Sequence, residues 1–138
     1  MLKATLQDIA DGTCSVLEHG YLDRVERPHG LPIGHRQVFA ELARPSFRDV
    51  EYDIGLVVEL DGRLFHDTAR QRDLDLDRDL ATAADGKDTV RLGWGQVFER
   101  PCWTADRIAT LLVRRGWRDH ASPCGPTCPV SSLDTRSA

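Results

Sequence analysis

The sequence predicts an α/β domain, because strand-like segments in the middle of the chain lie between segments with helical periodicity. Residues 56–60 read Leu-Val-Val-Glu-Leu, an apolar and β-branched run that is typical of a buried central strand. Residues 37–42 and 47–52 alternate between apolar and polar side chains, and short turns follow each of them. We therefore expect these three strands to form an antiparallel meander.

Three helices and a fourth strand, at 89–94, complete a predicted order of α-β-β-β-α-β-α. The first helix is expected to run from an N-cap at Thr13 to about Val25, where a segment containing proline and glycine ends it. The other two helices place apolar residues on one face: Leu76, Leu80, Ala83 and Ala84 in the helix at 68–84, and Ile108, Leu111 and Leu112 in the helix at 104–115, which Gly116 caps. We expect one domain over 1–120 and an irregular tail rich in Cys, Pro and Ser over 121–138.

The composition excludes a simple basic nucleic-acid binder and a membrane-spanning chain. The net charge is −4, and no apolar run approaches the about 20 residues that cross a bilayer. The first ten residues lack the apolar core of a secretory signal, so we expect a cytoplasmic protein. Residues 49–88 carry a net charge of −7, whereas 21–48 and 89–138 carry +2 and +3. This distribution suits a metal site beside surfaces that contact phosphate, but it also suits a solvated acidic helix.

Three carboxylates on two neighbouring strands form a candidate metal site. Glu59 and Asp61 are two residues apart, so they point to the same face, and Glu59 interrupts an apolar run. Asp49 lies on the preceding strand, within reach across a short hairpin. Oxygen ligands of this kind suit Mg²⁺ or Mn²⁺, which can polarise a phosphodiester and activate water. The alternative is a strand end whose carboxylates pair with surface arginines, Asp61-Gly62 being a common turn pair.

His66 and Arg78 are candidate partners of these carboxylates. His66 can exchange a proton with water or contact phosphate, and Arg78 can stabilise developing phosphate charge. A surface histidine and an ordinary ion pair on the helix are the alternatives.

The segments Arg48-Asp49-Val50 and 56–66 (LVVELDGRLFH) resemble the very-short-patch-repair-like branch of the PD-(D/E)XK endonuclease superfamily, in particular its small actinobacterial members. The resemblance extends over 13–128. Its softer matches are the helix 70–84 with Arg78-Asp79, Val90-Arg91-Leu92, Gln96-Val97, Pro101-Cys102, Ala105 and Gly116-Trp117.

The resemblance implies a restriction-endonuclease-like mixed sheet, an antiparallel meander plus a crossover strand, flanked by helices. It also implies a metal-dependent DNA endonuclease in which Asp49 is the central metal ligand, in preference to Asp53 near the hairpin turn. Glu59 takes the second acidic position, and the carbonyl of Leu60 also faces the metal. His66 matches the histidine of a Gly-x-x-x-His motif. Glu18 matches an accessory acidic residue that binds the metal directly or through water.

One position departs from the family pattern. The superfamily's lysine, which positions the attacking water, falls at Asp61, so His66 or Arg78 would have to replace it. A catalytically weak or inactive nucleic-acid-binding or regulatory module on a nuclease fold is therefore the alternative function. Larger relatives carry an N-terminal winged-helix segment that has no counterpart here, so we expect a truncated or stand-alone nuclease domain.

The four cysteines suggest a second metal site. Cys14, Cys102, Cys124 and Cys128 could together hold a structural Zn²⁺ that fixes the tail to the first helix. In the alternative, Cys14 and Cys102 are buried as small apolar residues and the other two are free thiols in a mobile tail.

Overall fold

A computed structural model describes residues 16–41, 45–62 and 69–130 and has an α/β fold. Residues 16–20 are α-helical and continue into a π-helical segment, η1 (Tyr21–Glu26). The strands are β1 (His35–Glu41), β2 (Pro45–Tyr52), β3 (Leu56–Leu60) and β4 (Asp88–Leu92), and the remaining helical elements are α2 (Ala69–Ala84), η2 (Gly95–Glu99) and α3 (Pro101–Arg114). Among the helices of these residues, none has the length and apolar character needed to cross a membrane.

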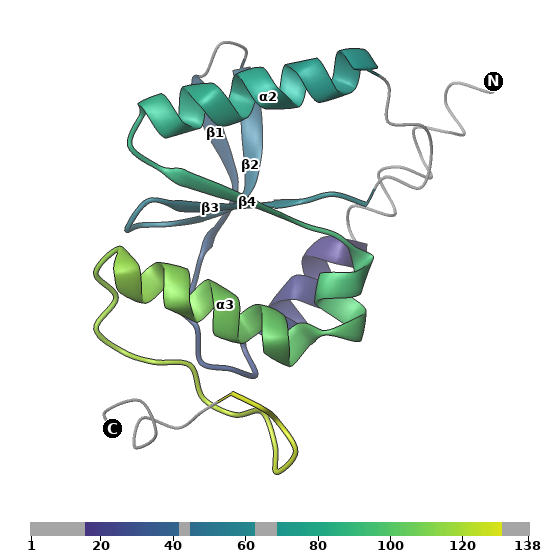
Figure 1. Ribbon diagram of the computed structural model, residues 1–138, viewed down its shortest axis with the longest axis vertical. Coiled ribbons are helices and arrows are strands. Elements are labelled where there is room, and N and C mark those ends of the chain that lie inside the picture. The colour runs from purple at the N-terminus through teal and green to yellow at the C-terminus, as the bar shows by residue number, and fades with distance from the viewer. Residues whose placement is uncertain (1–15, 42–44, 63–68, 131–138) are drawn as a thin grey trace, which may run out of the picture.

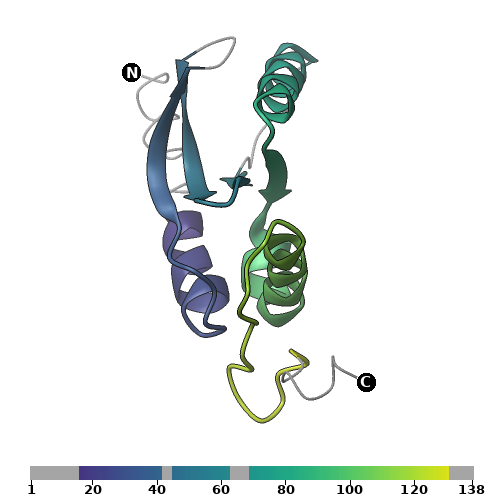
Figure 2. The ribbon, with the colours of Figure 1, turned by 90° about the vertical axis from the view of Figure 1, so that its left-hand side faces the viewer.

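The four strands form one mixed sheet in the order β1-β2-β3-β4. The first three strands are antiparallel neighbours, which confirms the predicted meander, and β4 runs parallel to β3. A parallel pair needs a crossover connection, and α2 provides it. Figure 1 shows the twisted sheet between α2 on one side and α3 with the two π-helical segments on the other, and in Figure 2 η1 continues the line of β1 and β2.

The two faces of the sheet differ in chemistry because successive side chains of a strand point to opposite sides. Val50, Tyr52 and Val58 belong to the main hydrophobic core. That core also contains Leu17 and Val25 of the N-terminal helical segment and Ile108 and Leu112 of α3. Of the predicted stripe of the last helix, Ile108 and Leu112 are therefore buried, and Leu111 is partly buried against them. The opposite face carries Glu51, which pairs with Lys87 after α2, and Glu59, which pairs with Arg78 on α2.

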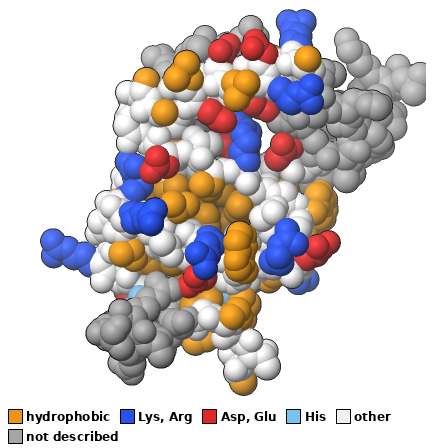
Figure 3. Space-filling view, viewed as in Figure 1, with side chains coloured by type: hydrophobic (Ala, Val, Ile, Leu, Met, Phe, Trp, Pro, Cys, Tyr) orange, Lys and Arg blue, Asp and Glu red, His pale blue; other side chains and the backbone are white. Residues whose placement is uncertain are grey.

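The apolar face predicted for α2 is wrong. Leu76 and Leu80 are 67% and 71% exposed. The helix turns Asp75, Arg78 and Asp79 toward the sheet instead, where they pair with charged residues of β3 and β4. Ion pairs with the strands therefore orient α2, and a polar layer separates it from the sheet. Acidic, basic and apolar side chains are mixed over this helix in the upper part of Figure 3.

A buried polar network joins η1 to the sheet on the core side. The Tyr52 hydroxyl donates to Glu26 Oε1 over 3.0 Å, and Tyr21 lies 2.6 Å from Tyr52, hydroxyl to hydroxyl. The Gly34 amide donates to the same carboxyl oxygen of Glu26 over 2.9 Å, and Arg36 lies 3.7 Å from the other. Burial raises the pKa of both tyrosines, so their hydroxyls stay protonated and can donate.

Residues 121–130 form no helix or strand but are held against the domain. Ala121 and Val130 are buried in the main core, and the Ser122 amide donates to the His29 carbonyl over 2.8 Å. Gly116, which ends α3, has a φ of +112°, and the Trp117 amide reaches back to the Leu112 carbonyl over 2.9 Å. This is the glycine C-cap that the sequence predicted.

Candidate metal-binding site between α2 and the sheet

Asp49 and Glu59 face each other across the β2–β3 pair. The register that pairs Val50 with Val58 and Glu51 with Val57 brings Asp49 level with Glu59. Both side chains point to the α2 side, opposite the hydrophobic core, and Asp49 is close enough to raise the pKa of Glu59. Two carboxyl groups that meet in this way form a potential cation site.

The backbone of Leu60 fixes the position of Asp49. Its amide donates a hydrogen bond of 2.7 Å to Asp49 Oδ2. The residue pairs of β2 and β3 run from Tyr52–Leu56 to Val50–Val58, and the Leu60 amide lies beyond the last of them. This bond holds the Asp49 carboxyl in place beside Glu59.

The surroundings of Glu59 favour its protonated form. Burial and the charge of Asp49 raise its pKa to about 7, and the nearby Arg78 and Arg91 only partly oppose this shift. Glu59 therefore keeps its proton up to near-neutral pH. A divalent cation would have to displace that proton.

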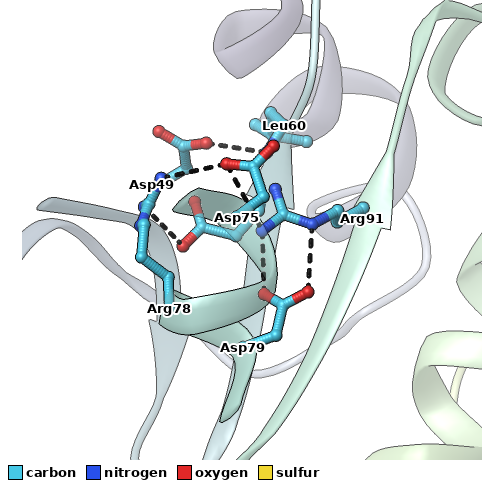
Figure 4. Close-up of polar contacts among 7 residues, drawn as sticks. Asp49, Leu60, Asp75, Arg78, Asp79 and Arg91 are labelled. Carbon is cyan, nitrogen blue, oxygen red and sulfur yellow. Dashed lines mark hydrogen bonds and ion pairs between the residues drawn. The ribbon is translucent and has the colours of Figure 1, made fainter. Parts of the chain in front are cut away.

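Charged residues of α2 and β4 surround this pair (Figure 4). Arg78 donates to Glu59 Oε1 over 3.4 Å and lies 3.7 Å from Asp75 Oδ1. Arg91, which is next to Glu59 in the β3–β4 register, makes two hydrogen bonds to Asp79, of 2.8 and 3.4 Å. Its Nη2 also lies 3.9 Å from Asp75.

Six residues make up the carboxylate–arginine cluster: Asp49, Glu59, Asp75, Arg78, Asp79 and Arg91. Four carboxyl groups and two guanidinium groups leave a formal excess of two negative charges when all are ionised. Oxygen donors are the ligand type that Mg²⁺ and Mn²⁺ prefer, although no three of these carboxyl groups bring their ligand oxygens within 4.8 Å of one another.

The structure brings together Asp49, Glu59 and Arg78 of the predicted site. Leu60 joins them through its amide. Asp61 directly follows β3 and is half-buried, with its own amide bonded to the Leu92 carbonyl over 2.8 Å. The carbonyl of Glu18 accepts a hydrogen bond from Arg36, and its role as an accessory ligand stays a prediction. His66 lies outside the described residues.

Asp53 does not belong to the cluster. Its side chain is 84% exposed in the turn between β2 and β3, where it pairs with His35 Nε2 at 2.7 Å. The preference for Asp49 over Asp53 is therefore consistent with the structure.

Three members of the cluster had no role in the predicted site: Asp75, Asp79 and Arg91. Asp75, Arg78 and Asp79 have the i, i+3, i+4 spacing of one helix face, but the leucines of α2 are the stronger signal for a buried face. Arg91 interrupts an otherwise apolar part of β4, as Glu59 interrupts β3. An acidic residue in one apolar strand and a basic residue in the next suggest an ion pair, and this is the sequence signal that indicates Arg91.

A second group of metal-ligand side chains lies at the other end of the molecule. His29 Nε2 and the sulfur atoms of Cys102, Cys124 and Cys128 are all within 4.8 Å of one another. Three of the four predicted cysteines are thus together, and His29 is a member that the sequence did not indicate. Cys14 lies outside the described residues. None of the three described cysteines is in a disulfide.

The three thiols differ in acidity. Burial raises the pKa of Cys102 to about 12, and its hydrogen bonds with Cys128 and Cys124 add to this effect. At Cys128 burial acts in the same direction, but hydrogen bonds with the backbones of Cys124 and Val130 and with the other two thiols outweigh it and lower the pKa to about 6. One thiolate therefore exists within the group at neutral pH.

Comparison with protein-family models, with curated proteins and with solved structures finds no match to this chain.

Proposed function

We propose that this chain is a DNA endonuclease that depends on Mg²⁺ or Mn²⁺ and hydrolyses phosphodiester bonds at the carboxylate–arginine cluster. The observation that carries the proposal is the meeting of Asp49 and Glu59 on adjacent strands, on the side of the sheet away from the core. A sheet face that only supports a helix has no need of two opposed carboxyl groups, because apolar side chains pack there at lower cost.

The residues of the cluster would divide the work as follows. Asp49 and Glu59 hold the cation, and the Leu60 amide keeps Asp49 in place. The guanidinium group of Arg78 already contacts the Glu59 carboxyl group, so it is placed to neutralise charge on the phosphate. Arg91 holds Asp79 and Asp75 and so positions α2 above the strands. The bound metal ion would supply a polarised phosphate and a water of lowered pKa.

DNA binding is supported by the distribution of charge. Basic side chains predominate among the charged ones over α3 in the lower half of Figure 3, below the acidic and basic mixture of α2. Such a surface can contact phosphates that flank the cluster.

A plasmid-nicking assay with and without Mg²⁺ or Mn²⁺ tests the proposal. Glu59→Gln keeps the shape of the side chain and removes its charge, so we expect nicking to fall at least about 100-fold. Asp53→Asn is the matched control, because it removes an exposed carboxylate from the same hairpin and should leave the rate unchanged. Nicking that persists in purified Glu59→Gln protein would exclude the cluster as the active site.

The arginines of the cluster support a second candidate function, a non-catalytic nucleic-acid-binding module. Arg78 and Arg91 already neutralise part of the carboxylate charge, and Asp61 stands where the resemblance expects a lysine. This candidate predicts salt-sensitive DNA binding without nicking under any metal.

The variant Asp61→Lys separates the two candidates. If the cluster is an active site that lacks only the lysine of the family pattern, this change should raise the metal-dependent nicking rate by roughly 10-fold or more, because it adds a positive group beside the scissile phosphate. If neither the natural chain nor Asp61→Lys nicks DNA, while both bind it, the non-catalytic module is favoured.

A further inference from the structure

We propose that His29, Cys102, Cys124 and Cys128 bind one structural zinc ion that fastens residues 121–130 to α3 and to the loop after η1. This site is independent of the carboxylate–arginine cluster, and it does not rest on the proposed nuclease function. Its ligands come from three places in the chain: the turn after η1, the second residue of α3 and the irregular segment that follows α3.

The spacing of the ligand atoms matches a tetrahedral zinc site. Zn–S bonds of about 2.3 Å and Zn–N bonds of about 2.0–2.1 Å put neighbouring ligand atoms of a tetrahedron roughly 3.5–3.8 Å apart. His29 Nε2 lies 3.4 Å from Cys102 Sγ, and Cys102 Sγ lies 3.5 Å from Cys124 Sγ. All four atoms lie within 4.8 Å of one another, so a small contraction would close the shell.

The ring of His29 is held in the orientation that a metal ligand needs. His29 is fully buried, and its Nδ1 lies 2.8 Å from the Val25 carbonyl oxygen. A carbonyl can only accept a hydrogen bond, so Nδ1 carries the proton and Nε2 has a lone pair directed at the sulfurs. Metal-ligating histidines are commonly fixed by such a bond on the second ring nitrogen.

The chemistry of the donors selects zinc rather than magnesium. Three sulfurs and one imidazole form the Cys₃His set of structural zinc sites, whereas Mg²⁺ requires oxygen ligands. Cys102 is the second residue of α3, so the helix start fixes where its sulfur points. The Gly125–Cys128 turn, closed by a 3.1 Å bond from the Cys128 amide to the Gly125 carbonyl, returns Cys128 to the same point as Cys124.

The site explains how a segment without helix or strand stays in place. Beyond the metal ligands, residues 121–130 are anchored in the core by Ala121 and Val130 and tied to His29 by the Ser122 amide. A bound ion would join the same His29 to Cys124 and Cys128 and close the attachment from both sides. No ligand position is left for water or substrate when four protein atoms coordinate the ion, so the role is structural.

Metal analysis of the full chain, purified without chelators, tests the inference. We expect about one zinc per chain, and replacement of zinc by Co²⁺ should give the intense visible bands of tetrahedral coordination together with a sulfur-to-metal charge-transfer band. His29→Gln and Cys124→Ser should both lose the zinc and the cobalt spectrum. Cys124 is exposed, so its variant should retain the fold of the domain even if the variant of the buried His29 does not.

Two control variants identify the ligands. Cys14→Ser should retain the metal, and so should His120→Gln, whose imidazole bonds the neighbouring Ala121 carbonyl and is absent from the group. Loss of zinc from Cys14→Ser with retention in His29→Gln would replace this site by a four-cysteine site and overturn the inference. Protein that contains no zinc would overturn the inference as well. So would a Cys102–Cys124 disulfide that persists in protein purified with a reducing agent.

A chelator experiment measures what the ion does. Removal of zinc should lower the Tm by roughly 5 °C or more, since binding to the folded state alone adds stability. It should also make residues 121–130 accessible to a protease, while Glu59→Gln should leave the zinc content unchanged. An unaltered Tm and cleavage pattern after complete removal of zinc would contradict the structural role.

Discussion

The carboxyl groups of Asp49 and Glu59 face each other across two neighbouring strands, on the face of the sheet that α2 covers. Each group has its own fixed partner, because the Leu60 amide donates to Asp49 and Arg78 donates to Glu59. The Leu60 amide and the Arg78 guanidinium group therefore hold the two carboxyl groups in position. Both the acid–base behaviour of the protein and its response to metal should reflect this relationship.

The stability of the metal-free protein should depend on pH through Glu59. Its pKa is raised from 4.5 to about 7 by burial and by Asp49, so between these values the folded chain holds a proton that the unfolded chain releases. This contribution is fully present below pH 4.5 and is lost as the pH rises through 7, by at most about 3 kcal/mol. Urea unfolding in EDTA across this range, compared between the natural chain and Glu59→Gln, isolates the effect. Equal pH slopes in the two proteins would contradict it.

Divalent metal should stabilise the protein more at pH 7.5 than at pH 5, because the cation and the proton compete for the same carboxyl pair. At a Mg²⁺ concentration of 100 times the Kd, the expected gain is about 2.7 kcal/mol at the higher pH. Thermal unfolding with Mg²⁺ or with a matched monovalent salt measures it. The gain should vanish in Asp49→Asn and persist in Asp53→Asn, whose exposed side chain pairs with His35. A gain that does not change in Asp49→Asn would place the cation elsewhere.

The strands and the last helix could be predicted from sequence because a single signal dominates each of them. The short, apolar and β-branched run of β3 is typical of a buried strand, and Ile108 and Leu112 repeat at the helical spacing of a core-facing stripe. The same reasoning failed for α2, where Leu76 and Leu80 have the correct spacing but face outward. Hydrophobic periodicity assumes an apolar partner surface, and the sheet face under α2 carries charges instead.

The candidate sites were predictable only in part, since they depend on contacts between distant segments. Asp49 and Glu59 are joined by a short hairpin, so their meeting follows from strand pairing alone. Arg91 reaches Glu59 only through the parallel pairing that the crossover of α2 creates. His29 joins Cys102 from 73 residues away, and a lone histidine beside a proline gives no local sign of a metal site.

The leucines on the outer face of α2 should contribute little to stability. Leu80→Gln and Leu76→Gln are each expected to change the free energy of unfolding by less than about 0.5 kcal/mol, because both side chains are mostly exposed. Leu112→Ala, in the core face of α3, is the comparison and should cost about 3 kcal/mol. Urea denaturation of the three variants measures the difference. A cost for Leu80→Gln close to that of Leu112→Ala would mean that another surface covers α2 in solution.

Tyr52 should contribute more to the stability of the fold than Tyr21, because only Tyr52 donates a hydrogen bond to a carboxyl group. Tyr52 gives its hydroxyl proton to Glu26, so Tyr21 must be the donor in the 2.6 Å bond between the two hydroxyls. Tyr52→Phe removes the bond to the buried carboxyl and also leaves Tyr21 without its acceptor, which should lower the free energy of unfolding by about 2 kcal/mol. Tyr21→Phe removes one bond between neutral groups and should cost about 1 kcal/mol. Chemical denaturation of both variants and of the double variant measures these values, and a larger cost for Tyr21→Phe than for Tyr52→Phe would reverse the assigned direction of the bonds.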